Sequence, residues 1–144
     1  MEENKMKKYE LTTETKINIF GKKLFRIKAL VSFGSVIAGE KGGWIEEEEN
    51  LSQSGNAWVS GNAEVYGDAW VSGDADYTTI HGFGTQFRTT TFFRCKDKEI
   101  RVSCGCFFGT ISEFREQVKR TRKGKVAEEY LMIADLMEKH FKEE

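Results

Sequence analysis

Two arginines on neighbouring predicted strands are the side chains best placed to do chemistry. Residues 89–106 hold two β-rich runs separated by a polar turn, which predicts a β-hairpin. A turn centred on residues 97–98 places Arg94 directly opposite Arg101. Like charges across a strand pair repel each other, and a bound anion would offset that repulsion. Guanidinium groups bind phosphate or carboxylate in bidentate fashion, so this face predicts an anion-binding site.

Other side chains of the same face could contact such a ligand. Aromatic rings could stack on a base, and hydroxyl groups could donate hydrogen bonds. The predicted ligand-binding residues are Arg88, Phe92, Arg94, Arg101, Ser103 and Phe107. In the alternative interpretation, an acidic residue such as Glu99 or Glu113 folds back onto the arginines and the face is ordinary solvated surface. A one-residue shift of the register would separate the two arginines.

The three cysteines are expected on the opposite, apolar face of this hairpin. Strand parity places Cys95, Cys104 and Cys106 beside apolar neighbours, where a free thiol behaves as a small hydrophobe. His81 or His140 could complete a metal site, but the spacing lacks the C-x2-C knuckle that zinc favours. We therefore expect reduced, metal-free thiols, with no cofactor and no metal.

A six-residue repeat dominates the centre of the chain. Residues 55–78 form four tandem hexads that begin with Gly-Asn or Gly-Asp, carry Ala third and a large apolar residue fifth. A period of six predicts a short left-handed β-helix, with alanines and valines inside and Gly-Asn or Gly-Asp at the corners. About two coils cannot bury a continuous core, so capping elements and self-association are expected.

The flanking segments predict a mostly β fold with α-helices at the end. Residues 1–44 are expected to form an N-terminal β-hairpin cap and a glycine-rich lead-in, residues 45–84 the hexapeptide-repeat β-helix, and residues 85–144 a ββαα module. In the last segment Thr110 and Glu113 form a capping box, and apolar spacing predicts two helices that cover the sheet.

His81 is the residue that would support catalysis. Hexapeptide-repeat acyltransferases use a histidine as general base between neighbouring coils. Such enzymes need several more coils to form a cofactor groove, so we expect no catalytic residue and no enzymatic activity.

Two tryptophans of the repeat are expected to point outward. Trp58 and Trp70 alternate with the inward valines, and exposed tryptophans often anchor interfaces. They predict a homo-oligomer interface.

Composition restricts the class of protein further. Lys and Arg total 22 against 23 for Asp and Glu, so no net charge steers the chain toward nucleic acid or a membrane. No apolar run is long enough to span a membrane, and residues 1–10 lack the apolar stretch of a secretory signal. The expected location is the cytoplasm.

Several motifs resemble a known protein family. They are Gly42-Gly-Trp-Ile-Glu, Glu49-Asn-Leu-Ser, the Gly-Asn-Ala-x-Val-x repeat, Arg88-Thr-Thr-Thr-Phe-Phe-Arg94 and Cys104-Gly-Cys-Phe-Phe-Gly109. Together they resemble small phage and prophage proteins with hexapeptide repeats, often labelled polymer-forming or bactofilin-like. The resemblance implies a phage or prophage context in a bacterial host.

The sequence and the resemblance together predict a non-enzymatic, oligomeric binding protein. Its expected role is counter-defence, either by sequestering an anionic, nucleotide-like immune signal or by blocking a host immune protein such as a CRISPR nuclease. The alternatives are an acyltransferase relic that uses His81 and a purely structural, polymer-forming phage protein.

Overall fold

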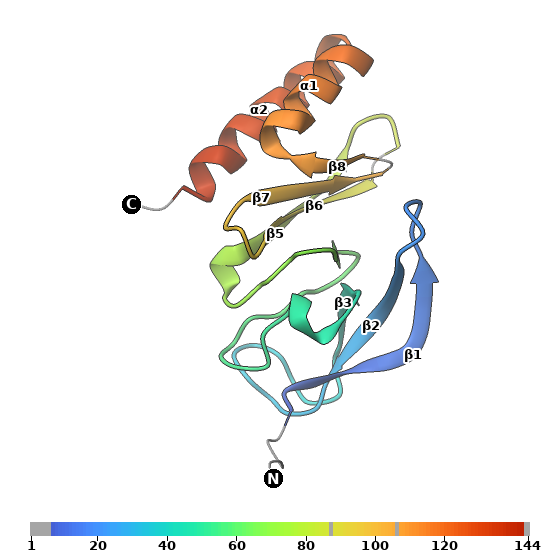
Figure 1. Ribbon diagram of the computed structural model, residues 1–144, viewed down its shortest axis with the longest axis vertical. Coiled ribbons are helices and arrows are strands. Elements are labelled where there is room, and N and C mark those ends of the chain that lie inside the picture. The colour runs from blue at the N-terminus through green and yellow to red at the C-terminus, as the bar shows by residue number, and fades with distance from the viewer. Residues whose placement is uncertain (1–6, 87, 106, 143–144) are drawn as a thin grey trace.

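The computed structural model describes residues 7–142 apart from Phe87 and Cys106. These residues form two four-stranded sheets and two C-terminal helices, stacked in layers along the long axis of the molecule (Figure 1). In chain order the elements are β1 (Tyr9–Ile17), β2 (Lys23–Ala29), β3 (Lys41–Ile45), η1 (Glu48–Asn50), β4 (Glu64–Val65), η2 (Asp74–Asp76), β5 (Tyr77–Phe83), β6 (Arg88–Arg94), β7 (Ile100–Cys104), β8 (Phe107–Thr110), α1 (Ile111–Thr121) and α2 (Gly124–His140).

The first sheet grows from the N-terminal hairpin. β1 pairs antiparallel with β2, β2 antiparallel with β3, and β3 parallel with the two-residue β4. The expected hairpin is confirmed, and its first strand begins at Tyr9, which is fully buried. The tyrosine hydroxyl donates to the Leu51 carbonyl at 2.6 Å, so this strand is tied to the chain that leads into the repeat.

The prediction of a left-handed β-helix is wrong. Apart from β4, η2 and the first two residues of β5, the repeat contributes isolated bridges, including a parallel one between Leu51 and Val71, and its other described residues lie mostly in turns and loops. The alanines and valines of the first three hexads still point into the core, since each of them is at most 1% exposed. Four hexads are too few to cover one another as stacked coils. Tyr9, Ile27 and Phe93, from outside the repeat, complete that core instead.

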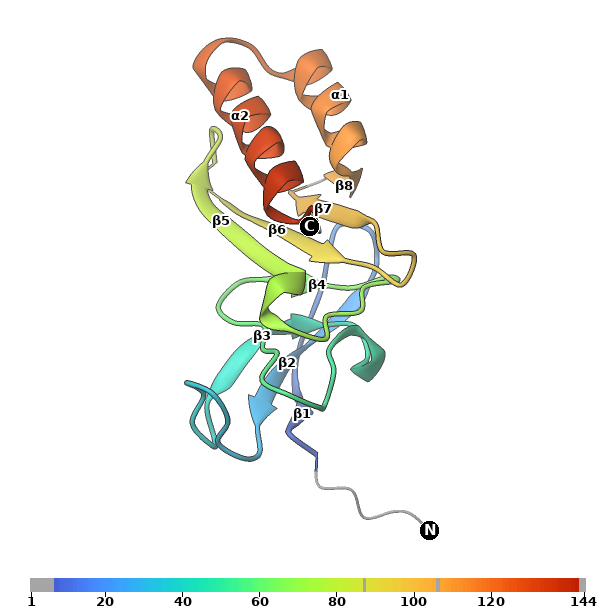
Figure 2. The same cartoon turned by 90° about the vertical axis from the view of Figure 1, so that its left-hand side faces the viewer.

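The second sheet lies in the middle of the molecule and has the order β5-β6-β7-β8 (Figure 2). Both of its faces contribute buried residues. Phe92 and Val102 pack toward the helices, whereas Phe93 and Cys95 join the core of the first sheet. The expected hairpin is therefore present as β6 and β7, but it belongs to a larger sheet.

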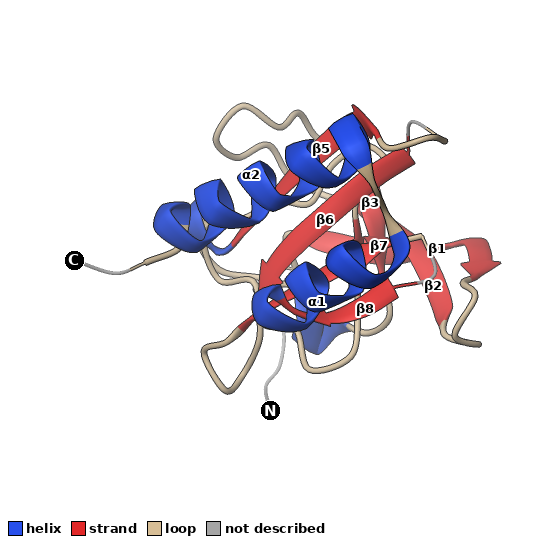
Figure 3. Cartoon of the chain, turned by 90° about the horizontal axis from the view of Figure 1, so that it is seen from above, coloured by secondary structure: helices blue, strands red, loops and turns tan. Residues whose placement is uncertain are grey.

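The helices cover one face of the second sheet, as the sequence predicts. Thr110 accepts from the Glu113 amide at 3.1 Å while Glu113 accepts from the Thr110 amide at 2.8 Å, which confirms the capping box. Figure 3 shows α1 and α2 side by side over the strands. Among the described residues, no helix is long and apolar enough to cross a membrane.

Candidate functional site

The two arginines of the predicted binding face do not face each other. In the structure Arg94 pairs with Ile100 and Arg101 pairs with Phe93, one residue away from the expected register. Since a one-residue shift reverses side-chain orientation, the two guanidinium groups lie on opposite faces of the sheet. The expected cross-strand repulsion is therefore absent, and that part of the prediction is wrong.

Arg94 instead joins the sheet to the end of α2. Its guanidinium donates to Asp76 Oδ1 at 3.0 Å, and to the carbonyls of Lys98 and Phe141 at 3.2 Å each. Burial alone would raise the pKa of Asp76, but hydrogen bonds from Ser72 and from Arg94 lower it below its ordinary value. These contacts leave little of Arg94 for a ligand.

Three further residues of the predicted set also have structural partners. Arg101 donates to Asp97 Oδ2 at 2.8 Å, so an acidic residue does fold back onto each arginine. Ser103 shares a 2.8 Å hydrogen bond with the Tyr66 hydroxyl and is buried. Phe92 is fully buried and packs edge-on against Phe114. The alternative interpretation, in which acidic residues fold back onto the arginines, is therefore correct for Arg94 and Arg101.

Arg88 and Phe107 remain, and they line a small hollow at one end of the helical layer. The hollow measures about 180 Å³ and lies between the loops that flank β6 and β8, the end of α1 and the middle of α2. Its walls are formed by Phe83, Thr85, Gln86, Arg88, Cys104, Gly105, Phe107, Phe114, Gln117, Val118, Thr121, Arg122 and Tyr130. We call it the arginine hollow.

The walls of the arginine hollow carry positive charge only. Arg88 and Arg122 line it, no Asp or Glu does, and neither arginine makes an ion pair with another described residue. The contact of Arg88 there is with a neutral group, the Gln86 carbonyl oxygen at 2.8 Å. An arginine without a carboxylate partner retains its donors for an anionic ligand.

Gly105 lets Arg88 reach this position. The glycine has a φ of +58°, and a Cβ there would collide with a terminal nitrogen of Arg88. The guanidinium therefore packs directly against the Gly105 backbone, whose positive φ favours glycine. This close approach holds Arg88 in the wall of the hollow.

A thiol and a phenol form part of the floor. Cys104 Sγ accepts from the Thr90 hydroxyl at 3.1 Å and lies 3.9 Å from the Tyr130 hydroxyl. Burial raises the pKa of Tyr130 to about 12, with Cys104 adding to the shift and Arg122 and Arg88 opposing it. The phenol stays neutral at physiological pH and could donate a hydrogen bond.

A second, larger cavity begins on the other side of Arg88. This cleft of about 390 Å³ lies between the N-terminal hairpin and the second sheet, and it shares Arg88 and Gly105 with the hollow. His81 lines it, with Nδ1 2.8 Å from the Thr89 hydroxyl. The cleft is charge-balanced on its hairpin side, where Lys16 and Glu64 form a 2.6 Å ion pair.

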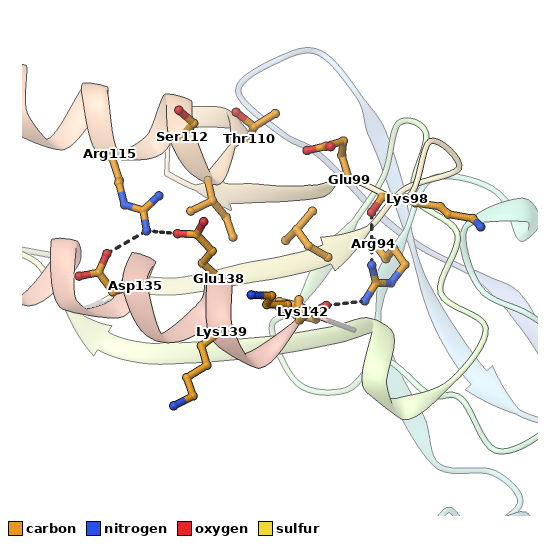
Figure 4. A pocket seen from close by; sticks show the side chains of 13 residues that line it. Arg94, Lys98, Glu99, Thr110, Ser112, Arg115, Asp135, Glu138, Lys139 and Lys142 are labelled. Atoms are coloured by element: carbon orange, nitrogen blue, oxygen red, sulfur yellow. Dashed lines mark hydrogen bonds and ion pairs between the residues drawn. The ribbon is translucent and has the colours of Figure 1, made fainter. Parts of the chain in front are cut away.

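A depression larger than the hollow and the cleft lies at the opposite end of the helical layer (Figure 4). It measures about 930 Å³ and opens where α1 begins and α2 ends. Arg115, one of its cations, contacts both Asp135 and Glu138, and Arg94 is held by the contacts described above. Figure 4 shows Asp135 and Glu138 turned toward Arg115. The arginines of this groove are thus already neutralised.

The cysteines do not share one face. Cys95 is buried in the core of the first sheet, whereas Cys104 is half-buried on the helix side. The expectation of a common apolar face is therefore wrong for these two, and Cys106 lies outside the described residues. Among the described residues, no cluster of three His, Cys, Asp or Glu side chains could hold a metal ion.

The two tryptophans of the predicted interface differ. Trp70 is 53% exposed, as strand parity predicts, and its interface role stays a prediction. The outward orientation of Trp58 is wrong, because this side chain is buried against Tyr9 and Phe33. The first sheet covers the position that a regular coil would have left open.

Arg122 and Tyr130 are the residues that sequence reasoning missed. In the sequence, Arg122 belongs to a group of cations that suit the end of a helix, and Tyr130 belongs to an apolar helical stripe, and neither pattern indicates a binding site. Their shared place in the walls of the arginine hollow depends on how the helical hairpin lies on the sheet.

Comparisons with known proteins give limited information. No protein-family model matches the chain, and no solved structure matches it significantly. The chain is 41% identical over 64 residues to a protein of Escherichia coli (strain K12) named uncharacterized acetyltransferase YdcK. The match covers 38% of this chain and 19% of the relative's length. It is loosely consistent with a hexapeptide-repeat protein, and the relative's name conflicts mildly with the expected lack of enzymatic activity.

Proposed function

We propose that the chain is a binding protein that holds a small anionic group in the arginine hollow. The observation that carries this proposal is the pairing of Arg88 and Arg122 in walls that contain no acidic residue. Several aromatic and aliphatic side chains line the same hollow, and they lower the local polarity and strengthen a charge-assisted hydrogen bond. A phosphate or carboxylate group suits these donors best.

The experiment is calorimetric titration of the full chain with inorganic phosphate at low and moderate salt. We expect saturable binding that weakens with ionic strength. Replacing Arg122 by Ala should reduce the affinity roughly 10- to 100-fold, since it removes a charge-assisted hydrogen bond. The melting temperature without ligand should stay nearly unchanged, because Arg122 is exposed.

Arg120→Ala is the matched control. Arg120 is also an exposed arginine at the end of α1, but it does not line the hollow and donates to Gln117 of its own helix. Equal loss of affinity in both variants would show that phosphate responds only to general surface charge. That result would refute the proposed site.

A second candidate function is acetyl transfer with His81 as general base. Two observations favour it: His81 lines the polar cleft, and the E. coli relative is named an acetyltransferase. His81→Gln should then abolish acetyl-CoA turnover without changing phosphate binding. Absence of any turnover by the wild-type chain would remove this candidate.

The narrower expectations stay predictions. They are the phage origin, the counter-defence role against a nucleotide signal or a host immune protein, the cytoplasmic location and the polymer-forming alternative. An anionic signal molecule would be compatible with the arginine hollow, and this is the only link between the site and that role.

A further inference from the structure

Helix α2 presents an apolar pair to solvent on the side away from the sheet. Met132 is 69% exposed and Leu136 is 57% exposed. The opposite side of the helix is buried in the core through Tyr130, Ile133, Ala134 and Met137. Helix α2 lies in the outermost layer of the molecule (Figures 1 and 3), and both side chains of the pair are exposed there.

The exposed side of α2 has the spacing of a helix-pairing seam. Lys125, Glu129, Met132, Leu136 and Lys139 follow one another at intervals of four, three, four and three residues, which places them along one stripe. Such alternation is the pattern by which two helices pack knobs into holes. We call it the α2 stripe.

Charges flank the apolar pair in a self-complementary order. Acidic Glu128 and Glu129 precede it, and Lys139 and His140 follow it. If two copies of α2 cross antiparallel about residue 134, Met132 meets Leu136 of the other copy and Glu129 meets Lys139. Neither Glu129 nor Lys139 makes an ion pair with another described residue, so both charges remain available.

We propose that the α2 stripe binds the α2 stripe of a second copy, forming an antiparallel two-fold dimer. A two-fold interface requires a surface that complements itself, and the order acidic, apolar, basic meets this requirement when one helix is reversed. The two-fold axis repeats the Glu129–Lys139 contact, so both of these flanking contacts join opposite charges. The proposal is independent of the arginine hollow, which lies on the sheet side of the helices.

The test is sedimentation equilibrium of the full chain across micromolar to high micromolar concentrations. Wild type should show a monomer–dimer equilibrium, and Leu136→Glu should be monomeric throughout. Glu129→Lys and Lys139→Glu should each weaken the dimer about 5- to 30-fold, because each creates two like-charge contacts per dimer. The double variant, Glu129→Lys with Lys139→Glu, should restore dimerisation to near the wild-type level.

Two controls separate this surface from others. Asp68→Lys reverses an exposed charge on the loop after β4 and should leave the dimer unchanged. Trp70→Glu tests the earlier interface prediction. A wild-type chain that stays monomeric, a dimer that survives Leu136→Glu, or a dimer lost only in Trp70→Glu would each overturn the α2 proposal. At concentrations too low for dimers to form, Leu136→Glu and Lys139→Glu should melt at the wild-type temperature, because Leu136 and Lys139 are exposed in the single chain.

Discussion

The two ends of the helical layer contrast in size and in charge. The groove where α1 begins and α2 ends measures about 930 Å³, but its arginines already contact Asp76, Asp135 and Glu138. The arginine hollow where α1 ends measures about 180 Å³ and has no carboxylate in its walls. An arginine that already has its counter-ion stabilises the fold, whereas one without a counter-ion can bind a ligand. Charge pairing, and not volume, therefore distinguishes the candidate site.

The largest expected effect is in thiol reactivity. Burial raises the pKa of Cys95 to about 11, so at pH 8 only about one molecule in a thousand carries its thiolate. Cys104 lines the arginine hollow and is half-buried. In a Cys106→Ser background, we expect Cys104 to react with iodoacetamide at least about 100-fold faster than Cys95, measured by peptide mass spectrometry.

Adding phosphate to the labelling reaction tests whether the anion binds in the arginine hollow. It should slow the labelling of Cys104 and leave Cys95 unaffected, because only Cys104 lines the hollow. Equal labelling rates for the two thiols would show that the burial difference does not exist in solution. Labelling of Cys104 that ignores phosphate would place the anion elsewhere.

The next effect is on stability at the opposite end of the layer. The Arg94 and Asp76 side chains are each only 17% exposed, so Arg94→Ala leaves a largely shielded carboxylate without its counter-ion. We expect a loss of about 2 to 4 kcal/mol in the free energy of unfolding, measured by urea denaturation. Arg101→Ala is the control, and its exposed partner Asp97 predicts a loss below about 1 kcal/mol.

If Arg94→Ala instead removed phosphate binding while the fold kept its stability, the contrast between the two ends would be reversed. Arg94 would then be a ligand residue, as the sequence alone predicts, and the groove of Figure 4 would be the binding site.

A smaller effect is expected from the glycine that supports Arg88. In Gly105→Ala the new methyl group would displace the guanidinium, so phosphate affinity should fall roughly 3- to 10-fold by calorimetry, less than when the arginine is removed. Gly21→Ala is a matched control, since Gly21 also has positive φ, +81°, but no atom lies within 4 Å of its added Cβ. Equal affinity in the two variants would mean that Arg88 does not need this contact.

Local patterns in the sequence predicted local structure well. The hairpins, the capping box at Thr110 and the helical apolar stripes depend on neighbouring residues, and the structure has them. The inward alanines and valines of the first three hexads are also correct, whereas Ala75 of the fourth hexad is exposed. The prediction of a β-helix failed because the repeat pattern describes the shape of a single coil. It does not tell how many coils must stack to bury a common core.

The candidate site could be predicted only in part for a related reason. The faces of β6 and β7 depend on register, and the single-residue shift moved Arg94 and Arg101 to opposite sides of the sheet. The expectation of one buried face and one open face on this hairpin also failed, because both faces contribute buried residues. Arg88 was found from its charge, whereas its pairing with Arg122 arises from tertiary packing between a strand end and a helix end.

The smallest expected effect is on the acid dependence of stability. Burial raises the pKa of Asp76, but bonds from Ser72 and Arg94 outweigh it, so the folded-state pKa lies below that of the unfolded chain. The resulting stabilisation is complete above the ordinary aspartate pKa of about 3.9 and is lost as the pH falls toward the folded-state value. Between about pH 5 and 2, Asp76→Asn should therefore lose stability less steeply than wild type in urea denaturation. Arg94→Ala should show a weaker flattening, because Ser72 still donates to the carboxylate through its amide at 3.0 Å and its hydroxyl at 2.9 Å. If the free energy of unfolding fell equally steeply with pH in wild type and Asp76→Asn, these bonds would not hold the carboxylate. The groove at the start of α1 would then lack the charge pairing that distinguishes it from the arginine hollow.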